Sequence, residues 1–142
     1  MTARAHADAM LELARAAPGT TPLVVFDGYV PKDATGKRHP PPYALAYFSD
    51  SDPEDADSRP LEDTPGRFVL TAWWHLVGEN AAATRALAER LRAALLGKTP
   101  TVAGRVCFPI RREEANPPEP DESTGGLVFD RVDVYRFASE PA

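Results

Sequence analysis

The sequence has almost no cysteine, and this limits how the protein can be stabilised. Cys107 is the only cysteine among the 142 residues. Neither an internal disulfide nor a zinc site built from several thiolates can therefore form. Cys107 lies in the apolar run RVCFPI, which favours a buried, small hydrophobic side chain over a reactive thiol. A chain of this length buries roughly 70% of its unfolded surface, so it can fold without disulfides or metals. We therefore expect a single domain, residues 1–142.

Long apolar runs are also missing. No segment approaches the roughly 18 consecutive apolar residues that a membrane-spanning helix requires. Charged residues, among them Arg4, Asp8 and Glu12, interrupt the alanine-rich N-terminal segment, which therefore lacks the apolar stretch of a signal peptide. We expect a soluble protein that is made in a cytoplasm and does not bind membranes.

The sequence lacks the usual catalytic and metal-binding motifs. It contains no Gly-x-Ser-x-Gly, His-Glu-x-x-His or Cys-x-x-Cys, and its three histidines, at 6, 39 and 75, do not have metal-ligand spacing. His75 lies near Glu79 in the stretch WWHLVGEN, which raises the possibility of a small enzyme with these two residues as its acid–base groups. We favour a structural role for His75, and we expect neither a cofactor nor a metal.

The acidic segment that begins at Asp50 also resembles a calcium-binding EF-hand loop, but two required positions hold the wrong residues. Asp50, Asp52 and Glu54 match positions 1, 3 and 5 of an EF-hand loop. Position 6 requires glycine and holds Asp55, and position 12 requires glutamate and holds Leu61. The segment is therefore predicted to be a solvated hairpin tip.

Acidic residues gather in two segments of the chain. Residues 49–63 hold seven acids and one base, and residues 111–122 hold five acids and two bases, so the rest of the chain carries about +4 of the net charge of −5. The basic residues form no helical stripe that would read a nucleic-acid groove.

The hydrophobic pattern predicts helices over residues 2–17 and 81–97. In the second helix Asn80 is the N-cap, Gly97 ends the helix, and the buried stripe consists of Thr84, Leu87, Ala88, Leu91, Ala94 and Leu95. Gly78 is expected to permit the sharp turn that leads into it. Strands are predicted within 22–30, 43–48, 66–78, 104–110 and 127–137. The order favours an α+β domain, with one mainly antiparallel or mixed sheet of about five strands and two main helices packed on one face.

Alternation in the third strand suggests that both faces of the sheet are covered. Phe68, Leu70, Ala72, Trp74 and Leu76 share one face, and Val69, Thr71, Trp73, His75 and Val77 share the other. Helices can cover one face, and a second subunit is the candidate for the other. Long loops are predicted at 31–42, 49–65 and 111–126.

The order of these segments resembles the tail terminator proteins of long, non-contractile-tailed phages of actinobacteria. The resemblance is carried by VVFDGYVP, PPYALAYFSD, VGENAAATRALAERLRAALLGK, VAGRVCFPI and VFDRVDVYRF, and it covers nearly the whole chain. Relatives often have glutamine or glutamate where this chain has Ala83, so the expected capping box is incomplete.

The resemblance implies a structural virion protein rather than an enzyme. Such subunits form a hexameric ring on the last layer of the tail tube, stop its growth and present a surface to the head. The implied partners are copies of the chain, the major tail tube protein and the head-to-tail connector. Candidate interface residues are Tyr43, Tyr47, Asp50, Asp52, Glu54, Asp55, Asp57, Trp73, Trp74, His75, Arg111, Arg112, Glu113 and Glu114.

Two further expectations follow. Acidic groups of Asp50–Asp63 and Glu113–Glu122 would face the bore of the ring and repel the genomic DNA that passes through it without sequence-specific binding. A head-closure or connector protein of the phage neck is the alternative, because it also forms a ring; it would bind the portal-side ring rather than the tail tube.

Overall fold

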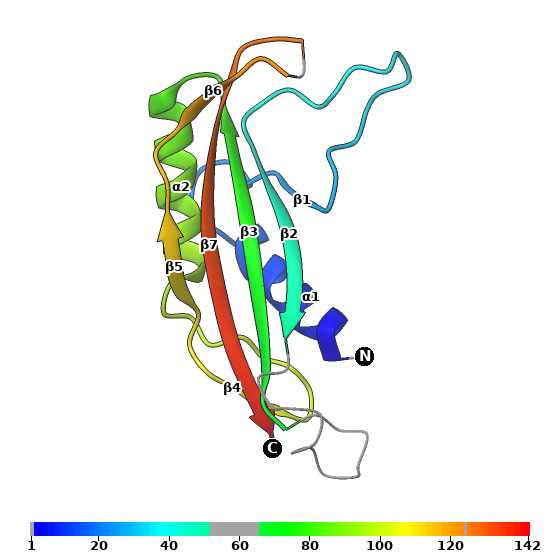
Figure 1. The fold of residues 1–142 in the computed structure, drawn as a ribbon, viewed down its shortest axis with the longest axis vertical. Helices are drawn as coiled ribbons and strands as arrows, with labels where there is room; N and C mark the ends of the chain where they lie inside the picture. Colours follow the sequence, from blue (N-terminus) through cyan, green and yellow to red (C-terminus); the bar gives the residue numbers. More distant parts are fainter. Residues whose placement is uncertain (1, 52–65, 124) are drawn as a thin grey trace.

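The computed structural model describes residues 2–51, 66–123 and 125–142. Within these residues it has two helices and one seven-stranded sheet (Figure 1). The elements are α1 (Thr2–Arg15), β1 (Val25–Asp27), β2 (Tyr43–Ser51), β3 (Phe68–Gly78), α2 (Ala81–Leu95), β4 (Arg105–Cys107), β5 (Arg111–Ala115), β6 (Glu119–Asp121) and β7 (Val128–Pro141). Neither described helix is long and apolar enough to cross a membrane.

The sheet is mixed but mainly antiparallel. Its strand order is β1-β2-β3-β7-β4, and β5 and β6 also pair with β7. Only β1 pairs in parallel, with β2, among the described strand pairs. This confirms the expected α+β class with two helices.

Two strands of the sheet were not predicted from the sequence. The predicted loop at 111–126 contains β5 and β6, and β2 continues to Ser51 into the predicted loop at 49–65. The polar segments RREEA and EPD lack apolar alternation, so nothing in them predicted strands. They form strands because β7 is 14 residues long and its outer edge presents backbone groups that need partners.

The helices cover one face of the sheet, and the main core lies between them and that face (Figure 1). The predicted alternation of β3 is confirmed, since its five alternate residues from Phe68 to Leu76 are all buried. The predicted stripe of α2 is confirmed at all six positions. Burying these side chains supplies most of the stabilisation of the fold.

His6 belongs to this core. Its side chain is fully buried, its Nε2 lies 2.6 Å from Ser139 Oγ, and its ring packs on Phe68 and Phe137. Cys107 packs against the same core but is only partly buried, so the expectation of a buried, small hydrophobic side chain is met in part. It lies in β4, a short strand at the edge of the sheet formed by the described residues. Burial raises the pKa of its thiol.

The junction between β3 and α2 depends on close packing. The Oδ1 of Asn80 accepts a hydrogen bond from the backbone N–H of Ala83 at 2.7 Å, which confirms Asn80 as the N-cap. Gly78 does not adopt a positive φ, so it permits the turn into α2 through close packing and not through a left-handed backbone. A Cβ at position 78 would lie 2.7 Å from Thr84 Oγ1 and 2.8 Å from its backbone nitrogen. Glycine is required because the helix lies against the end of the strand.

A smaller hydrophobic cluster covers part of the other face. Val30, Tyr43, Leu45 and Val77 are buried there. The segment after β1 folds over them, with a single backbone bridge between Lys32 and Arg38. The predicted loop at 31–42 is therefore anchored at one end by Val30.

Candidate protein-interaction face

The candidate site is the sheet face that points away from α1 and α2, here called the outer face. Its centre consists of Tyr47 on β2, Trp73 on β3 and Val134 on β7, which are register neighbours in adjacent strands. Tyr47 is 43% exposed and Trp73 is 38% exposed, whereas Val134 is buried. Neither described helix covers this part of the sheet (Figure 1).

Two adjacent aromatic side chains on a rigid sheet are well suited to bind a protein. Tryptophan and tyrosine offer large contact areas with few rotatable bonds, and they are enriched among residues that dominate interface energetics. Antiparallel pairing of β2, β3 and β7 holds both rings in place. Covering these two rings with a partner therefore costs little additional conformational entropy.

An ion pair lies beside the aromatic centre. His75 Nδ1 is 3.0 Å from Asp130 Oδ2, and both side chains are about one-quarter to one-third exposed. The hydrogen bond with Asp130 raises the pKa of His75, while partial burial acts in the opposite direction. The ring of His75 also meets the ring of Tyr47 edge-on, with centroids 5.5 Å apart.

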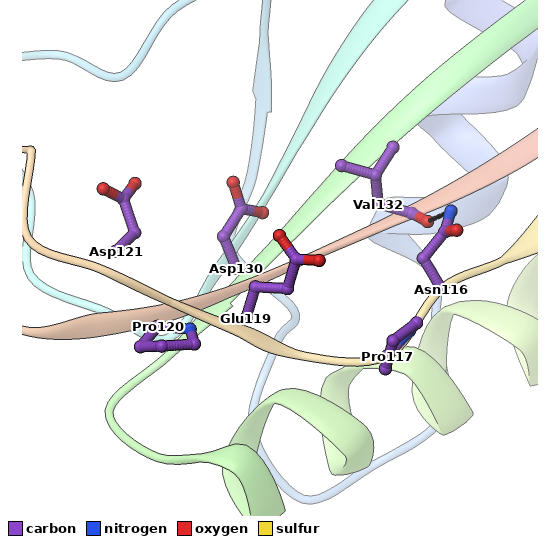
Figure 2. Close-up of a pocket in the computed structure, with 7 residues that line it drawn as sticks. All are labelled: Asn116, Pro117, Glu119, Pro120, Asp121, Asp130 and Val132. Carbon is purple, nitrogen blue, oxygen red and sulfur yellow. Dashed lines mark hydrogen bonds between the residues drawn. The ribbon is translucent and has the colours of Figure 1, made fainter.

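One end of the outer face is acidic, and we call it the acidic end. Glu119 and Asp121 of β6 and Asp130 of β7 line a hollow of about 320 Å³ there. Figure 2 shows the three carboxylates pointing to the same side of the two strands. None of the residues that line the hollow is a lysine or an arginine, so its lining is negatively charged, and Arg38 lies near enough to Asp121 to interact with it electrostatically.

The acidic end is positioned by the residues that follow β5. The side-chain N–H of Asn116 donates to the backbone carbonyl of Val132, which Figure 2 shows as a dashed line. The backbone N–H of Asn116 donates to Asp133 Oδ1 at 3.3 Å. Asp133 is fully buried and also accepts from Arg131 Nε at 2.8 Å. These bonds fix the chain where it leaves β5 toward β6.

The opposite end of the outer face is basic, and we call it the basic end. Arg67, Arg111 and Arg136 line a hollow of about 310 Å³, together with apolar side chains that include Phe108. The guanidinium of Arg67 lies 5.8 Å from the centroid of the Phe108 ring. Glu113 Oε1 lies 2.8 Å from Arg136 Nε and 3.5 Å from Arg111. This carboxylate thus offsets part of the charge of two of the three arginines.

The structure brings about half of the described candidate interface residues together. Tyr47, Trp73 and His75 lie on the outer face. Arg111, Glu113 and Glu114 lie along its edge in β5, where a bulge between Arg112 and Glu114 shifts the register with β7. Arg112 pairs with Tyr135 and therefore points to the helix-covered face.

Other candidates lie elsewhere. Trp74 is fully buried in the main core, and Tyr43 is buried beneath the segment after β1, so assigning them to an interface was wrong. Both were chosen because of their residue type, while strand alternation and a covering segment decide their exposure. Asp50 is exposed but shares the opposite face with Leu70. The candidates at Asp52, Glu54, Asp55 and Asp57 lie outside the described residues.

Sequence reasoning missed the residues that give the outer face its charge pattern. Asp130 and Arg136 were placed in the last strand, but their neighbours depend on the register between β3 and β7. Alternation alone could have put Asp130, Val132, Val134 and Arg136 on one face. No local sequence pattern predicted that Arg67 and Glu119 lie on this face. Their positions depend on pairings between segments far apart in the sequence.

The structure gives His75 a different partner from the one considered in the sequence. The imidazole contacts Asp130, and Glu79 is exposed beyond the end of β3. Among the described residues, no group of three or more histidine, cysteine, aspartate or glutamate side chains could hold a metal ion.

Comparison with known proteins identifies the fold but not a family. No protein-family model and no curated protein sequence matches the chain. One similar solved structure aligns over 98% of this chain and 93% of its own, with a TM-score of 0.57 and 16% sequence identity. At this identity the similarity applies to the fold alone.

Proposed function

We propose that the chain is the tail terminator of a long, non-contractile phage tail. In this role it forms a hexameric ring on the end of the tail tube, stops tube growth and joins the tail to the head-side connector in the virion. The observation that carries the proposal is the exposed Tyr47–Trp73 pair on a rigid sheet face between two charged ends. The order of the motifs in the chain resembles that of phage tail terminator proteins, and we therefore assign the interface to this function.

The composition of the outer face supports binding to protein. Aromatic and arginine side chains are enriched in protein interfaces, and both types are concentrated here. A closed ring requires each subunit to meet its neighbours with complementary surfaces. The centre and the basic end of the outer face, together with the edge formed by β5, are the surfaces that we assign to contacts with neighbouring subunits, the tube protein and the connector.

We narrow the proposal that acidic groups face the bore. Glu113 is paired with Arg136 and Arg111, so its charge is already offset. Glu114, Glu119, Asp121 and Glu122 remain as the acidic groups in this part of the chain. We assign DNA repulsion to them rather than to Glu113. If Lys replacement of these four residues leaves DNA retention and ejection unchanged, this assignment is wrong.

A complementation assay tests the role in tail assembly. Without the protein, host cells should produce tails of excessive length, and supplying the wild-type chain should restore the normal length. Trp73→Ala should fail to restore it, because truncation removes the larger exposed aromatic group. Arg85→Ala on the exposed side of α2 is the matched control and should restore it. Normal tail length in the absence of the protein would contradict the proposal.

A binding assay separates this role from the alternatives. A terminator binds the ends of purified tail tubes, whereas a head-closure protein binds the portal-side ring. His75→Ala separates both from an enzyme, because loss of a turnover activity with intact particle assembly would assign the imidazole to catalysis.

A further inference from the structure

The outer face carries a pattern of charge that reverses from one end to the other. Along β7 this face carries Asp130, Val132, Val134, Arg136 and Ala138 in turn, and the exposed Glu140 follows near the end of the strand. Glu119 and Asp121 add carboxylates beside Asp130, and Arg67 and Arg111 add guanidinium groups beside Arg136. The order from Asp130 to Arg136 is therefore acidic, apolar, basic, with about 20 Å between the two ends at about 3.3 Å per residue.

This order makes the face complementary to itself. When two copies stack face to face about a two-fold axis perpendicular to their strands, the acidic end of each meets the basic end of the other. The axis crosses β7 between Val132 and Val134, and Trp73 is paired with Val134 in the sheet. The exposed Trp73 rings of the two copies therefore meet close to the axis. The alternative stacking, with strands parallel, places like charges opposite each other and is disfavoured.

We propose that the outer face binds the same face of a second copy of this chain, so that the free protein is a two-fold symmetric dimer. The inference shares with the proposed function only the premise that this face is a protein interface. In a two-fold symmetric contact, if residue i of one copy meets residue j of the other, then residue j of the first copy also meets residue i of the second. The acidic–apolar–basic order satisfies that requirement, whereas an unrelated partner would need to match it by coincidence.

The open part of the face is large enough for a small dimer interface. The part that the segment after β1 leaves uncovered extends about 20 Å along the strands and about 20 Å across β2, β3, β7 and β5, which gives on the order of 400 Å² of flat area. Side-chain relief increases this value, which stays below the roughly 800 Å² per partner of a standard interface. The aromatic centre provides most of the attraction, and the charged ends determine the orientation.

Charge reversal at each end tests the proposal with the full-length chain. One variant combines Arg67→Glu with Arg111→Glu, which makes both ends acidic, and the other combines Glu119→Arg with Asp121→Arg, which makes both ends basic. By sedimentation and native mass spectrometry, we expect the wild-type chain to be a dimer. Each variant alone should associate at least tenfold more weakly, because each end then meets its own charge. An equal mixture should form a heterodimer, in which both ends are again complementary.

The matched control reverses charge away from the face. Arg85 and Glu89 lie one turn apart on the exposed side of α2, and the Arg85→Glu, Glu89→Arg variant should dimerise like the wild type. A wild-type chain that stays monomeric up to about 0.1 mM overturns the proposal, because an interface of this size would associate there. A wild-type assembly larger than a dimer, or unchanged dimerisation of the reversed variants, also overturns it.

Cross-linking provides a second test that does not depend on charge. In a Cys107→Ala background, Val132→Cys places one thiol near the proposed axis in each copy and keeps Trp73. Stacked sheets lie about 10 Å apart, which is too far for a disulfide, so a bismaleimide with a span of about 10 Å is the cross-linker. It should yield a covalent dimer, while a cysteine at Glu89 should not. Failure to cross-link through position 132 overturns the proposal. The result is independent of the tail-assembly assay, because a wild-type chain that stays monomeric in solution and still terminates tails would reject the dimer and retain the proposed function.

Discussion

At the scale of a single residue, the partner of His75 determines how the protein responds to pH. The hydrogen bond with Asp130 raises the pKa of the imidazole above its value in the unfolded chain. The protonated form is therefore favoured in the folded state. The stabilisation is fully present below the unfolded pKa of about 6.5 and is lost as pH rises through the higher folded pKa.

We predict that the stability advantage of wild type over His75→Gln is larger at about pH 5.5 than at about pH 8.5. Because the pair is partly exposed, the difference should be on the order of 0.5 kcal/mol. Urea unfolding at both pH values measures it. Asp130→Asn should abolish the difference, since the neutral amide no longer favours the charged imidazole. An equal advantage at both pH values would show that the ion pair does not contribute.

At the scale of the elements, the approach of α2 to the end of β3 explains why position 78 is glycine. We predict that Gly78→Ala lowers the free energy of unfolding by about 1–3 kcal/mol, because the added methyl group meets the backbone of α2. Chemical denaturation measures this loss. Gly126→Ala is the control, since no atom lies within 4 Å of the position of its added Cβ. If the two variants are equally stable, the helix has room to move away.

The start of α2 allows a second prediction at this scale. Asn80→Ala should lower the free energy of unfolding by about 1 kcal/mol, because the backbone N–H of Ala83 loses its acceptor. Asn80→Asp should retain the stability, since aspartate keeps an oxygen at this position and its charge favours the N-terminus of a helix. Thermal unfolding monitored by circular dichroism compares the three chains. A loss of equal size in Asn80→Asp would contradict the capping role.

The elements also show what the sequence could predict. Helical periodicity identified the six buried residues of α2, and alternation separated Trp73 from Trp74. Both patterns depend on positions a few residues apart in the sequence. The strands β5 and β6 depend instead on an unpaired edge of β7, and the two charged ends depend on register. Such long-range pairings leave no local signal, so half of the candidate site was not predictable.

At the scale of the whole molecule, the surface says more about function than the fold does. A solved structure with 16% identity shares the fold over nearly the whole chain, and folds of this kind serve many functions. The distinguishing features are the exposed aromatic pair and the opposite charges at the two ends of one face. Both proposals therefore place the function of the protein on that face.

The two tryptophans allow the use of this face to be measured directly in solution. Trp74 is fully buried and Trp73 is 38% exposed, so neutral acrylamide should quench mainly Trp73 in the dilute monomer. When the outer face is covered, by a second copy or by a ring neighbour, quenching of the wild type should fall toward that of Trp73→Phe. The Trp73→Phe chain itself, in which only Trp74 emits, should show the same quenching before and after assembly. If assembly leaves wild-type quenching at its dilute value, the face stays open to solvent, and neither the dimer nor the ring contact uses Trp73.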